Sequence, residues 1–575
     1  MTGLSWAGTT TFGVAATGVE GLKTIVPAAG IASWYDYFNS QGTQFGNAPY
    51  SDLSWLSLYV STRMLDQDDW AGIWQNYSNY INQLNKDQYA HDRNYSDVWK
   101  ERDYTLHPEN LKTSALIVHG LNDDNVKTKH FELMYDALKK AGQDVKLYLH
   151  QGDHVYPAAM SRGYGITAKG QDFYDLLNTW LTHYLYGVDN HVESLPAVLA
   201  QNNYDPSKWT SYDNWKSSQR LFLNAQSKRL EETISSDYAA AGVEIANRNE
   251  TVSKASSKAN LTFVSDVTED TTIKGHIPVH FKAALAKGQG KNFQLNALLV
   301  DVADEDFDVV GNGSVKPDKT ADAFWMGSNL SNLSVAEYET IKTKYKVIAK
   351  GWINLANPES GYDSASSRAS IEPKVGEFHD YTVYLQPNLY TVKKGHKLAL
   401  VFNTYDPSDL TVEHPYEVTF KTDSIQAVIP IVEKTRAQKA SYLPSASDTD
   451  YANLPEVEGA ALVAPEVHYK EEYTFPTPEH LVQPSQDFPE KVVEMKTASA
   501  AQEHPHLALA VSYGSQFVSP GLAEDPQAPT PAVEGGHADH TLPQTGSKED
   551  TLGLLGLFTL TASSLVFWRK KEEDA

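Results

Sequence analysis

Gly3-Leu4-Ser5-Trp6-Ala7-Gly8 stands almost at the start of the chain. This stretch has the glycine–serine frame of a nucleophile elbow, a sharp turn between a buried strand and a helix that presents a serine hydroxyl on an α/β sheet. The frame therefore predicts an α/β domain with Ser5 as its nucleophile. Only Met1 and Thr2 precede the frame, so the strand that should lead into the turn is almost absent.

The C-terminal segment predicts a cell-wall anchor. Leu542-Pro543-Gln544-Thr545-Gly546 is followed by an apolar run, Thr551 to Trp568, and then by Arg569-Lys570-Lys571. The run is about 18 residues long, just enough for a helix to cross a bilayer, and the basic cluster would hold that end in the cytoplasm. This order resembles the sorting signal of Gram-positive surface proteins, in which sortase cuts between Thr545 and Gly546 and joins the threonine to peptidoglycan.

Length and composition limit the remaining classes. The chain has 575 residues, which predicts two or three domains plus tails, and its net charge of −25 argues against binding to nucleic acid. It has no cysteine, which excludes disulfides and thiol catalysis. No signal peptide is visible, although export requires one. Together with the shortened elbow strand, this predicts the C-terminal part of a larger serine hydrolase, with Met1 an internal methionine of the parent.

Residues 1–187 alternate strands and helices, which predicts a parallel sheet. Buried strands are expected at 22–29, 115–119 and 145–149, and helices at 10–19, 127–141 and 173–186. Residues 34–110 are rich in Tyr, Trp, Asn and Asp and look mainly helical, so we interpret them as a cap insert. The predicted fold class of this region is the C-terminal part of an α/β-hydrolase catalytic domain.

Residues 188–433 read as a connector followed by an all-β domain. Short period-two strands are expected, for example at 281–285, 294–302, 381–385 and 397–402, and they predict a β-sandwich of the jelly-roll type. Residues 434–540 are rich in Pro, Ala, Glu and Ser, which predicts a disordered linker that spans the wall. Residues 541–575 would form the sorting signal, with one transmembrane helix at 551–568.

The catalytic residues are predicted from chain order. A serine nucleophile needs a base, and the base needs a carboxylate that orients it. In α/β hydrolases the order is Ser, Asp, His, with the acid and the base on loops after late strands. Asp123 follows the predicted strand 115–119, and His154 follows the strand 145–149. The sequence therefore predicts a triad of Ser5, Asp123 and His154.

Three neighbouring residues compete for these roles. Asp124 adjoins Asp123, and one residue of slip would exchange the two carboxylates. His150 lies closer to the end of its strand than His154 does, but the Gly-Asp-His turn suits a projecting base better. His119 lies inside the predicted strand, where a core histidine is the simpler interpretation.

Several stretches together resemble the Xaa-Pro dipeptidyl-peptidases of lactic acid bacteria. The similarity covers roughly residues 1–433, and the sorting signal would mark a cell-wall-anchored branch of a family with many cytoplasmic members. The matching stretches are Met1 to Gly8, Thr17-Gly18-Val19-Glu20-Gly21-Leu22-Lys23, Ser33-Trp34-Tyr35-Asp36-Tyr37, Val118-His119-Gly120-Leu121-Asn122-Asp123, His150-Gln151-Gly152-Asp153-His154 and Gly351-Trp352-Ile353-Asn354-Leu355.

The resemblance implies a mechanism. Ser5 would attack the carbonyl that follows a penultimate proline, His154 would carry the proton to the leaving amine, and Asp123 would hold the imidazole tautomer. One oxyanion donor would be the backbone N–H of Trp6. In this family the other is a tyrosine hydroxyl from the N-terminal half, which this sequence does not contain.

The resemblance also implies a proline pocket. Trp34, Tyr37 and Val126 match its positions, and flat aromatic walls suit a rigid pyrrolidine ring; ordinary cap packing is the alternative for the two aromatic residues. The family tends to show Gly-Glu-Asp-Leu just past the pocket, where a carboxylate would bind the substrate ammonium. Here Ser51 stands at the glutamate position, so Asp52 is the candidate carboxylate and dipeptidyl specificity is less secure than serine hydrolysis.

A cluster of acidic residues could offer ligands to calcium. Asp301, Asp304, Asp306 and Asp308 crowd one turn, and carboxylate oxygens suit calcium. Their spacing is not that of an EF-hand loop, so we interpret the cluster as a solvated acidic hairpin. The sequence predicts no metal and no cofactor.

The predicted function is that of a wall-anchored serine exopeptidase that releases Xaa-Pro dipeptides from proline-containing peptides. One alternative is an ester or amide hydrolase of the cocaine-esterase or amino-acid-ester-hydrolase type. Another is an inactive surface module that binds a ligand through its β-sandwich, because the shortened sheet would have exposed edges and an incomplete oxyanion hole. The expected partners are sortase and peptidoglycan, and a homodimer is left open.

Overall fold

The first sheet is built around β5 (Ser114–Gly120), all seven residues of which are buried in the computed structural model. An unbroken apolar run of this kind suits a strand that is covered on both faces. β5 pairs in parallel with β2 (Thr24–Ala28) on one side and with β6 (Val145–His150) on the other. The strand order is β1-β2-β5-β6-β9-β10, so the strands predicted from the three apolar runs form the middle of this sheet.

The outer strands complete the sheet. β1 (Thr2–Leu4) pairs in parallel with β2. β9 (Val198–Gln201) is parallel to β6, and β10 (Trp209–Tyr212) returns antiparallel beside it. The residues after 187 therefore do more than connect two domains, since they add two strands to the α/β sheet.

The part of the chain that the structure describes lies within one unit, Met1–Val482. No helix in this part is long and apolar enough to cross a bilayer. The predicted linker beyond 443, the apolar run 551–568 and the sortase site Thr545–Gly546 lie outside the described residues. The structure describes residues 1–45, 52–60, 70–154, 167–168, 171–206, 208–237, 256–315, 338–367, 369–404, 406 and 414–443.

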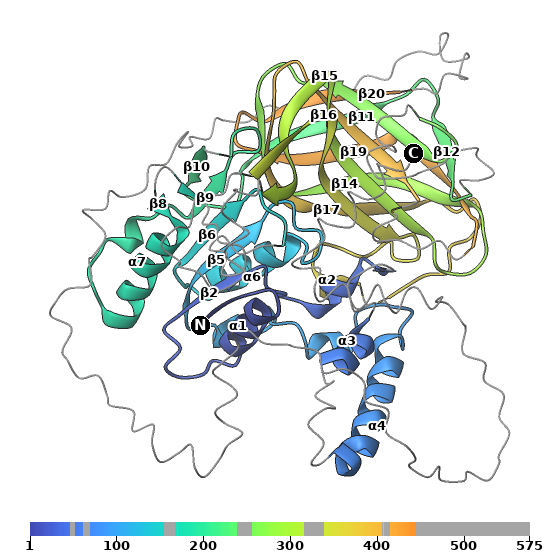
Figure 1. Ribbon diagram of the computed structural model, residues 1–575. Helices are drawn as coiled ribbons and strands as arrows, with labels where there is room; N and C mark the ends of the chain where they lie inside the picture. The colour runs from blue at the N-terminus through green and yellow to red at the C-terminus, as the bar shows by residue number, and fades with distance from the viewer. Residues whose placement is uncertain are drawn as a thin grey trace, which may run out of the picture. The chain divides into compact units, whose positions relative to one another are not determined.

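Helices cover both faces of the first sheet (Figure 1). Side chains of a strand alternate between its two faces. Ile117 of β5 packs in one cluster with helices α1 (Trp6–Ala16) and α6 (Lys129–Lys140). Its neighbour Leu116 packs in the opposite cluster, with α7 (Phe173–Tyr186).

The segment between β2 and β5 is mainly helical, as the sequence predicted, with a short hairpin added. Its tightest part is an aromatic cluster in which Trp34, Tyr35, Phe38 and Trp99 are all buried. Its elements are α2 (Trp34–Phe38), β3 (Asn39–Ser40), β4 (Thr43–Gln44), α3 (Leu53–Val60), α4 (Trp70–Gln88), α5 (Asp97–Lys100) and the 3-10 turn η2 (Pro108–Asn110). A second hairpin, β7 (Thr167–Ala168) with β8 (Gln171–Asp172), precedes α7, and the 3-10 turn η3 (Val192–Ser194) follows it.

The C-terminal part is a large β domain, but a jelly roll is not confirmed. Its hydrogen-bonded strands form one ten-stranded sheet, in the order β16-β15-β18-β13-β20-β11-β19-β14-β17, with β12 beside β19. The two end strands meet, because a Cβ on Gly351 of β16 would lie 2.4 Å from the carbonyl oxygen of Tyr384 in β17. The strands are β11 (Gln219–Gln226), β12 (Glu231–Ser235), β13 (Asn260–Asp266), β14 (Thr271–Lys287), β15 (Gln294–Val315), β16 (Tyr338–Asn354), β17 (His379–Val392), β18 (Lys397–Asn403), β19 (Glu417–Ile431) and β20 (Arg436–Tyr442), with a 3-10 turn η6 (Ser364–Ser366).

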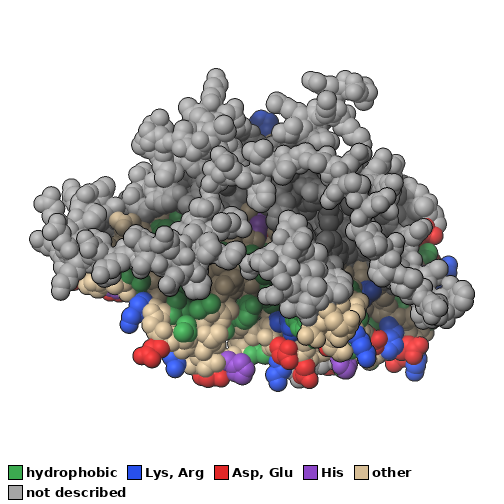
Figure 2. All heavy atoms as spheres, turned by 60° about the horizontal axis from the view of Figure 1, so that its bottom comes forward, with side chains coloured by type: hydrophobic (Ala, Val, Ile, Leu, Met, Phe, Trp, Pro, Cys, Tyr) green, Lys and Arg blue, Asp and Glu red, His purple; other side chains and the backbone are tan. Residues whose placement is uncertain are grey.

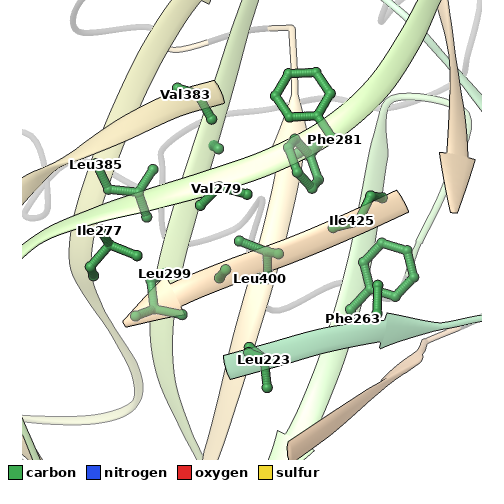
Figure 3. Packing of buried hydrophobic residues seen from close by; sticks show 14 of the residues in the cluster. Leu223, Phe263, Ile277, Val279, Phe281, Leu299, Val383, Leu385, Leu400 and Ile425 are labelled. Carbon is green, nitrogen blue, oxygen red and sulfur yellow. The ribbon is translucent and has the colours of Figure 1, made fainter. Parts of the chain in front are cut away.

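The core of this β domain follows from period-two patterning. Along β14, Ile277, Val279 and Phe281 are buried on alternate positions, while the residues between them are more exposed. Figure 3 shows these three side chains facing Leu400 and Phe263 from other strands of the curled sheet. The sheet thus encloses its own hydrophobic interior.

Two sequence boundaries are corrected by the structure. The helix expected at 10–19 starts at Trp6, directly after the elbow, and ends at Ala16, because Gly18 adopts a positive φ of 68° that suits a helix terminus. The linker expected from residue 434 starts later, because 436–442 form β20 between β11 and β13. Ala440 is fully buried in this strand, so composition alone did not reveal that residues 436–442 belong to the core.

The face of the described part that is visible in Figure 2 carries basic and acidic side chains interspersed with hydrophobic and other ones. Many exposed charges in the structure are paired, such as Lys291 with Asp92 at 2.9 Å and Lys393 with Asp270 at 3.0 Å. Exposed pairs of this kind contribute little to stability. The two hydrophobic interiors therefore dominate the folding free energy.

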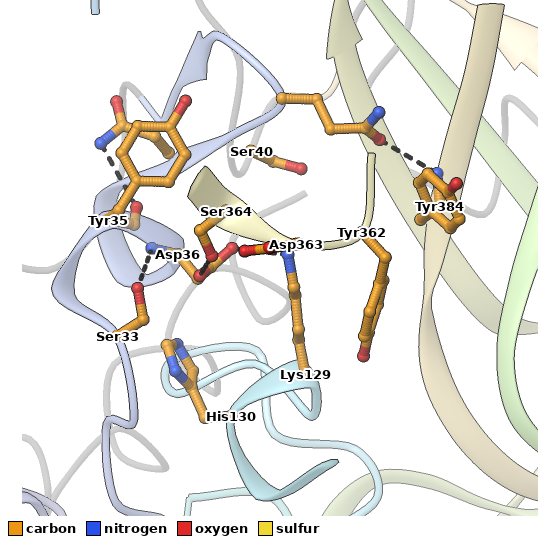
Figure 4. A network of polar contacts seen from close by, with 12 residues as sticks. Ser33, Tyr35, Asp36, Ser40, Lys129, His130, Tyr362, Asp363, Ser364 and Tyr384 are labelled. Atoms are coloured by element: carbon orange, nitrogen blue, oxygen red, sulfur yellow. Dashed lines mark hydrogen bonds and ion pairs between the residues drawn. The ribbon is translucent and has the colours of Figure 1, made fainter. Parts of the chain in front are cut away.

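A buried polar layer joins the α/β part to the β domain. Lys129 of α6 pairs with Asp36 of α2 at 2.6 Å, and Asp36 also accepts a hydrogen bond from Ser364 (Figure 4). One turn further along α6, Glu132 accepts hydrogen bonds from the Trp215 indole at 2.6 Å, from His276 Nδ1 at 2.7 Å and from the Tyr362 hydroxyl. Burial alone would raise the pKa of the Glu132 carboxyl, but the charge of His276 and the three hydrogen bonds lower it overall.

Replacement of Glu132 should therefore weaken the joined structure. We expect Glu132→Ala to destabilise the fold by about 3 kcal/mol, because the buried Trp215 indole and the partly buried His276 and Tyr362 would lose their common acceptor. The lowered pKa adds a pH dependence: the stabilisation is complete above the ordinary glutamate range and is lost as the pH falls through the folded-state value. Thermal unfolding followed by circular dichroism at pH 7 and pH 4 measures both effects.

The exposed Glu109, which pairs with His107 at 3.0 Å, provides the matched control. Glu109→Ala should leave the unfolding midpoint unchanged. An equal midpoint for Glu132→Ala and the unsubstituted chain would show that this layer does not hold the two parts together.

Candidate active site

Ser5 adopts a strained backbone conformation at the turn between β1 and α1. Its φ is 60° and its ψ is −117°, which is unusual for a residue other than glycine. The turn is held on both sides: the Ser5 N–H donates to the Ala28 carbonyl at 2.9 Å, and the Ser5 carbonyl accepts from the Thr9 N–H at 2.8 Å. The sharp strand-to-helix turn predicted from the glycine–serine frame is therefore present.

The two glycines of the frame are required by close backbone approach. A Cβ on Gly3 would lie 2.3 Å from the Cβ of Ala7, where the chain doubles back. A Cβ on Gly8 would lie 2.5 Å from the carbonyl oxygen of Ala28 in β2. The turn can thus form only with glycine at both positions, while Ala7 is accommodated between them.

Asp123 is fixed by its own loop. Its side chain is fully buried, and Oδ1 accepts the backbone N–H groups of Asn125 at 2.9 Å and Val126 at 3.0 Å. Its Oδ2 accepts from Nδ1 of His154 at 2.8 Å. The carboxylate therefore has both oxygens engaged, and only one of them faces the imidazole.

His154 is oriented by Asp123 and has its second nitrogen available. With Nδ1 donating to Asp123, Nε2 is the acceptor, and it is buried without a hydrogen-bond partner among the described residues. Burial alone would lower the pKa of His154. The charge of Asp123, its hydrogen bond and the charge of Asp153 outweigh burial, so the pKa is raised above its ordinary value.

The three competing residues have other environments. Asp124 points to Lys350, 2.6 Å away, and is largely exposed. His119 Nε2 donates to the Val126 carbonyl oxygen, 2.9 Å away, and burial lowers the pKa of His119. His150 accepts the Gly152 N–H at 3.1 Å, and burial lowers its pKa to about 3. Of these residues and the predicted pair, only Asp123 and His154 form a short carboxylate–imidazole contact, since His119 lies 3.8 Å from Asp123.

Ser5 and His154 are not hydrogen-bonded to each other in the described part of the chain. Hydrogen bonds between a catalytic serine and its histidine are often long or poorly aligned when no substrate is bound, so the missing bond is compatible with a catalytic pair. The strands that lead into both residues, β1 and β6, belong to the same parallel sheet, and both residues follow the carboxyl end of their strand. The sheet topology therefore delivers the three predicted residues to one edge.

The predicted pocket residues are brought together. Trp34, Tyr37 and Val126 are all buried and belong to one hydrophobic cluster. The rings of Trp34 and Tyr37 meet edge to face at 5.8 Å, and the ring of Trp6 lies 5.6 Å from that of Trp34. Trp6, which follows the predicted nucleophile, therefore contacts the aromatic rings of the predicted pocket.

Asn125 was missed by the sequence analysis. Its N–H binds Asp123, and its amide oxygen accepts from the Tyr37 hydroxyl at 2.8 Å. Asn125 therefore joins the pocket to the acid loop. Its position between two residues already singled out, Asp123 and Val126, was the only signal in the sequence.

Asp52 is held by the cap. It accepts hydrogen bonds from the Ser54 hydroxyl at 2.7 Å and from the Tyr89 hydroxyl at 3.0 Å. These contacts tie it to α3 and to the end of α4. Ser51, the residue at the expected glutamate position, lies outside the described residues.

The prediction of a solvated acidic hairpin in β15 is wrong for one of its carboxylates. Asp301 is fully buried and is not solvated: it accepts from Tyr204 at 2.8 Å, Tyr390 at 2.9 Å and His396 at 2.8 Å. Period-two patterning could not reveal this, because the partners come from distant segments. Asp304 is exposed and pairs with Lys397. Among the described residues, no group of three or more His, Cys, Asp or Glu side chains could hold a metal ion.

Comparison with family models gives three matches. Residues 1–156 match the X-Pro dipeptidyl-peptidase (S15 family), and residues 190–440 match the X-Pro dipeptidyl-peptidase C-terminal non-catalytic domain. Residues 537–575 match the LPXTG cell wall anchor motif, which indicates a sortase-anchored protein of the Gram-positive cell surface.

Curated relatives support the same assignment. A Xaa-Pro dipeptidyl-peptidase of Lactiplantibacillus plantarum is 32% identical over 439 residues, which cover 71% of this chain and 51% of that protein. One of Ligilactobacillus salivarius is 30% identical over 461 residues, covering 75% and 54%. The chain spans about half the length of the curated relatives it matches.

Solved structures support the fold. An aminopeptidase from a Thaumarchaeota archaeon and a CocE/NonD family hydrolase from Staphylococcus aureus both align with a TM-score of 0.50. Their sequence identities are 15% and 14%; the alignments cover 75% of this chain, and 76% and 71% of the two structures. At such identities the similarity speaks for the fold alone, an α/β-hydrolase part followed by a large β domain.

His154 and His150 should titrate at clearly different pH values. In imidazole NMR spectra we expect His154 to titrate above the ordinary histidine range, while His150 stays neutral down to about pH 3. Asp123→Asn should bring the pKa of His154 below that range, because burial then acts without the opposing charge. Asp308→Asn, which removes an exposed charge paired with Lys342, serves as the control and should leave the pKa values of His154 and His150 unchanged. A His154 titration that does not respond to Asp123→Asn would rule out this pair.

Proposed function

We propose, on the premise that this chain belongs to the X-Pro dipeptidyl-peptidase (S15) family, that its site releases Xaa-Pro dipeptides from the N-termini of peptides. The observation that carries the proposal is the 2.8 Å contact between Asp123 and His154, at the same end of the sheet's parallel strands as the strained elbow serine. The family match over residues 1–156 includes all three residues. An acyl-enzyme mechanism follows from this arrangement.

In the acylation step, Ser5 Oγ attacks the carbonyl carbon of the substrate proline. His154 Nε2 takes the serine proton, and the imidazolium that forms is stabilised by Asp123 across the Nδ1 hydrogen bond. The proton then passes to the nitrogen of the leaving peptide as the C–N bond breaks. A water molecule, activated by the same imidazole, attacks the acyl ester and releases the dipeptide while the proton returns to Ser5.

The oxyanion would be stabilised by the start of α1. The N–H of Trp6, the first residue of α1, would donate to the tetrahedral oxygen, and the positive end of the helix dipole would add to this effect. The strained conformation of Ser5 fixes the direction of the turn before substrate arrives. Binding energy is then not needed to organise the turn.

The prolyl ring would occupy the space beside Trp34, Tyr37 and Val126. Burial of a rigid ring between aromatic walls gains hydrophobic free energy at little conformational cost. The Tyr37 hydroxyl holds the amide oxygen of Asn125, so the amide NH₂ is oriented as a donor. We propose that this NH₂ binds a peptide carbonyl of the substrate.

The nearest alternative is an ester or amide hydrolase with the same fold. Ser51 stands where the resemblance implies a glutamate for the substrate ammonium. Asp52 is the candidate substitute, but it is hydrogen-bonded within the cap by Ser54 and Tyr89. A site without an ammonium anchor would favour acyl groups that lack a free amine.

With the C-terminal motif as anchor, this chemistry would take place outside the cell. We propose that sortase cleaves between Thr545 and Gly546 and that peptidoglycan accepts Thr545. The substrates would then be proline-containing peptides in the medium or in the wall.

Loss of the nucleophile tests the proposal. We expect Ser5→Ala in the full-length protein to lower the turnover of Gly-Pro p-nitroanilide by at least about 10³-fold. Ser194→Ala, at an exposed hydroxyl on the η3 turn, should leave turnover unchanged. The unsubstituted protein should favour Gly-Pro p-nitroanilide over a simple aryl ester; a preference for the aryl ester would support the esterase alternative.

The pocket can be tested by side-chain truncation. We expect Trp34→Ala to raise KM for Gly-Pro p-nitroanilide about 10-fold, since one aromatic wall is lost, and to affect Gly-Ala p-nitroanilide much less. Tyr37→Phe keeps the ring but releases Asn125, so it should lower kcat for both substrates. Equal losses on both substrates in Trp34→Ala would show that Trp34 packs the cap without selecting proline.

A further inference from the structure

The loop that carries Asp123 is held by a strand of the β domain. Lys350 Nζ in β16 lies 2.6 Å from Oδ1 of Asp124, and Lys346 Nζ in the same strand donates to Oδ1 of Asn122 at 2.8 Å. The two lysines therefore engage the residues on both sides of Asp123. Neither of them was singled out by the sequence analysis.

The Lys350 contact separates two neighbouring carboxylates. Asp123 and Asp124 are adjacent in the chain, and like charges at such a distance disfavour each other. Lys350 neutralises Asp124 and draws it toward β16. Asp123 remains the carboxylate that faces His154, at 2.8 Å.

The Lys346 contact reaches the loop of the base as well. Asn122, which Lys346 binds, donates its side-chain N–H to the Gln151 carbonyl at 2.8 Å and its backbone N–H to the Gly152 carbonyl at 3.1 Å. His154 follows two residues after Gly152. One asparagine thus joins β16, the acid loop and the base loop.

Lys350 is unusually enclosed for a cation, and Lys346 is partly buried. Lys350 is 6% exposed, and its ammonium lies 5.4 Å from the centre of the Trp352 ring. Burial lowers the pKa of Lys346 to about 8. Enclosed ammonium groups are costly in free energy unless specific acceptors hold them, and here the acceptors belong to the acid loop.

We propose that Lys346 and Lys350 of the β domain are positioning residues of the catalytic site, which hold the acid loop so that Asp123 alone faces His154. The inference rests on the proposed function for its kinetic consequence. Its structural content, the control of the Asp123–His154 hydrogen bond by β16, can be measured without turnover.

The test compares substitutions along β16 in the full-length protein. Lys346→Met and Lys350→Met remove the two ammonium groups and keep most of the side-chain volume. Lys342→Met is the matched control, because Lys342 lies on the same strand and pairs with the exposed Asp308 at 3.2 Å. Lys350→Arg retains the positive charge. Asp124→Asn removes the carboxylate that pairs with Lys350, and Asp124 is the exposed member of the pair.

The first readout is the downfield proton NMR signal of the His154 Nδ1–H, together with the pKa of His154. The groups that face His154 are Asp123, Asp153 and His119. A loosened acid loop weakens the contribution of Asp123, so burial should lower the pKa of His154. We expect Lys346→Met, Lys350→Met and Asp124→Asn to lower this pKa and to weaken the signal, and Lys342→Met and Lys350→Arg to preserve both.

The second readout is the kinetics on Gly-Pro p-nitroanilide. We expect Lys350→Met to lower kcat about 10- to 100-fold with KM nearly unchanged, and to move the acid limb of the pH profile to lower pH. Lys350→Arg should restore both. A loss caused only by partial unfolding would lower the amount of active protein and leave the acid limb in place.

The result that would overturn the inference is an unchanged His154 signal and pKa in folded Lys346→Met and Lys350→Met. Because the NMR readout needs no turnover, it stands apart from the proposed reaction. Full activity of Ser5→Ala would refute the reaction and leave the β16 contacts to be judged by the NMR result alone.

Discussion

The hydrogen bond between Asp123 and His154 is the contact on which the organisation of the site depends. It joins the ends of β5 and β6, fixes the imidazole tautomer and leaves Nε2 as the acceptor. Every neighbouring group supports it in a different way: two backbone N–H groups hold the other carboxylate oxygen, Asn122 links the two loops, and β16 engages the residues beside Asp123. In the proposed reaction, the imidazole of His154 is therefore oriented before any substrate enters.

The β domain contributes to this preparation although its family match is described as non-catalytic. The polar layer around Glu132 and Lys129 fixes α6, which begins shortly after the acid loop, and the lysines of β16 hold that loop directly. The contacts at the domain junction and those of the acid loop therefore belong to neighbouring elements. Under the proposal, a shift of β16 would move the loop that carries Asp123.

The sequence revealed the local features and missed the long-range ones. The elbow at Ser5 and the three central strands could be predicted, because each depends on residues within one short stretch. The burial of Asp301, the strand β20 and the roles of Lys346 and Lys350 could not, since their partners lie far away in the chain. Asn125 is intermediate: its loop was recognised, but its bond to Tyr37 depends on the fold of the cap.

In the proposed reaction, Ser5 forms an acyl enzyme with His154 as its base. Mass spectrometry of the full-length protein, quenched during reaction with glycyl-proline p-nitrophenyl ester, tests this step directly. We expect a glycyl-prolyl adduct on the peptide that contains Ser5, and no such adduct in His154→Ala. Hydrolysis of the ester without an adduct on Ser5, or with an adduct on another residue, would refute the proposed reaction.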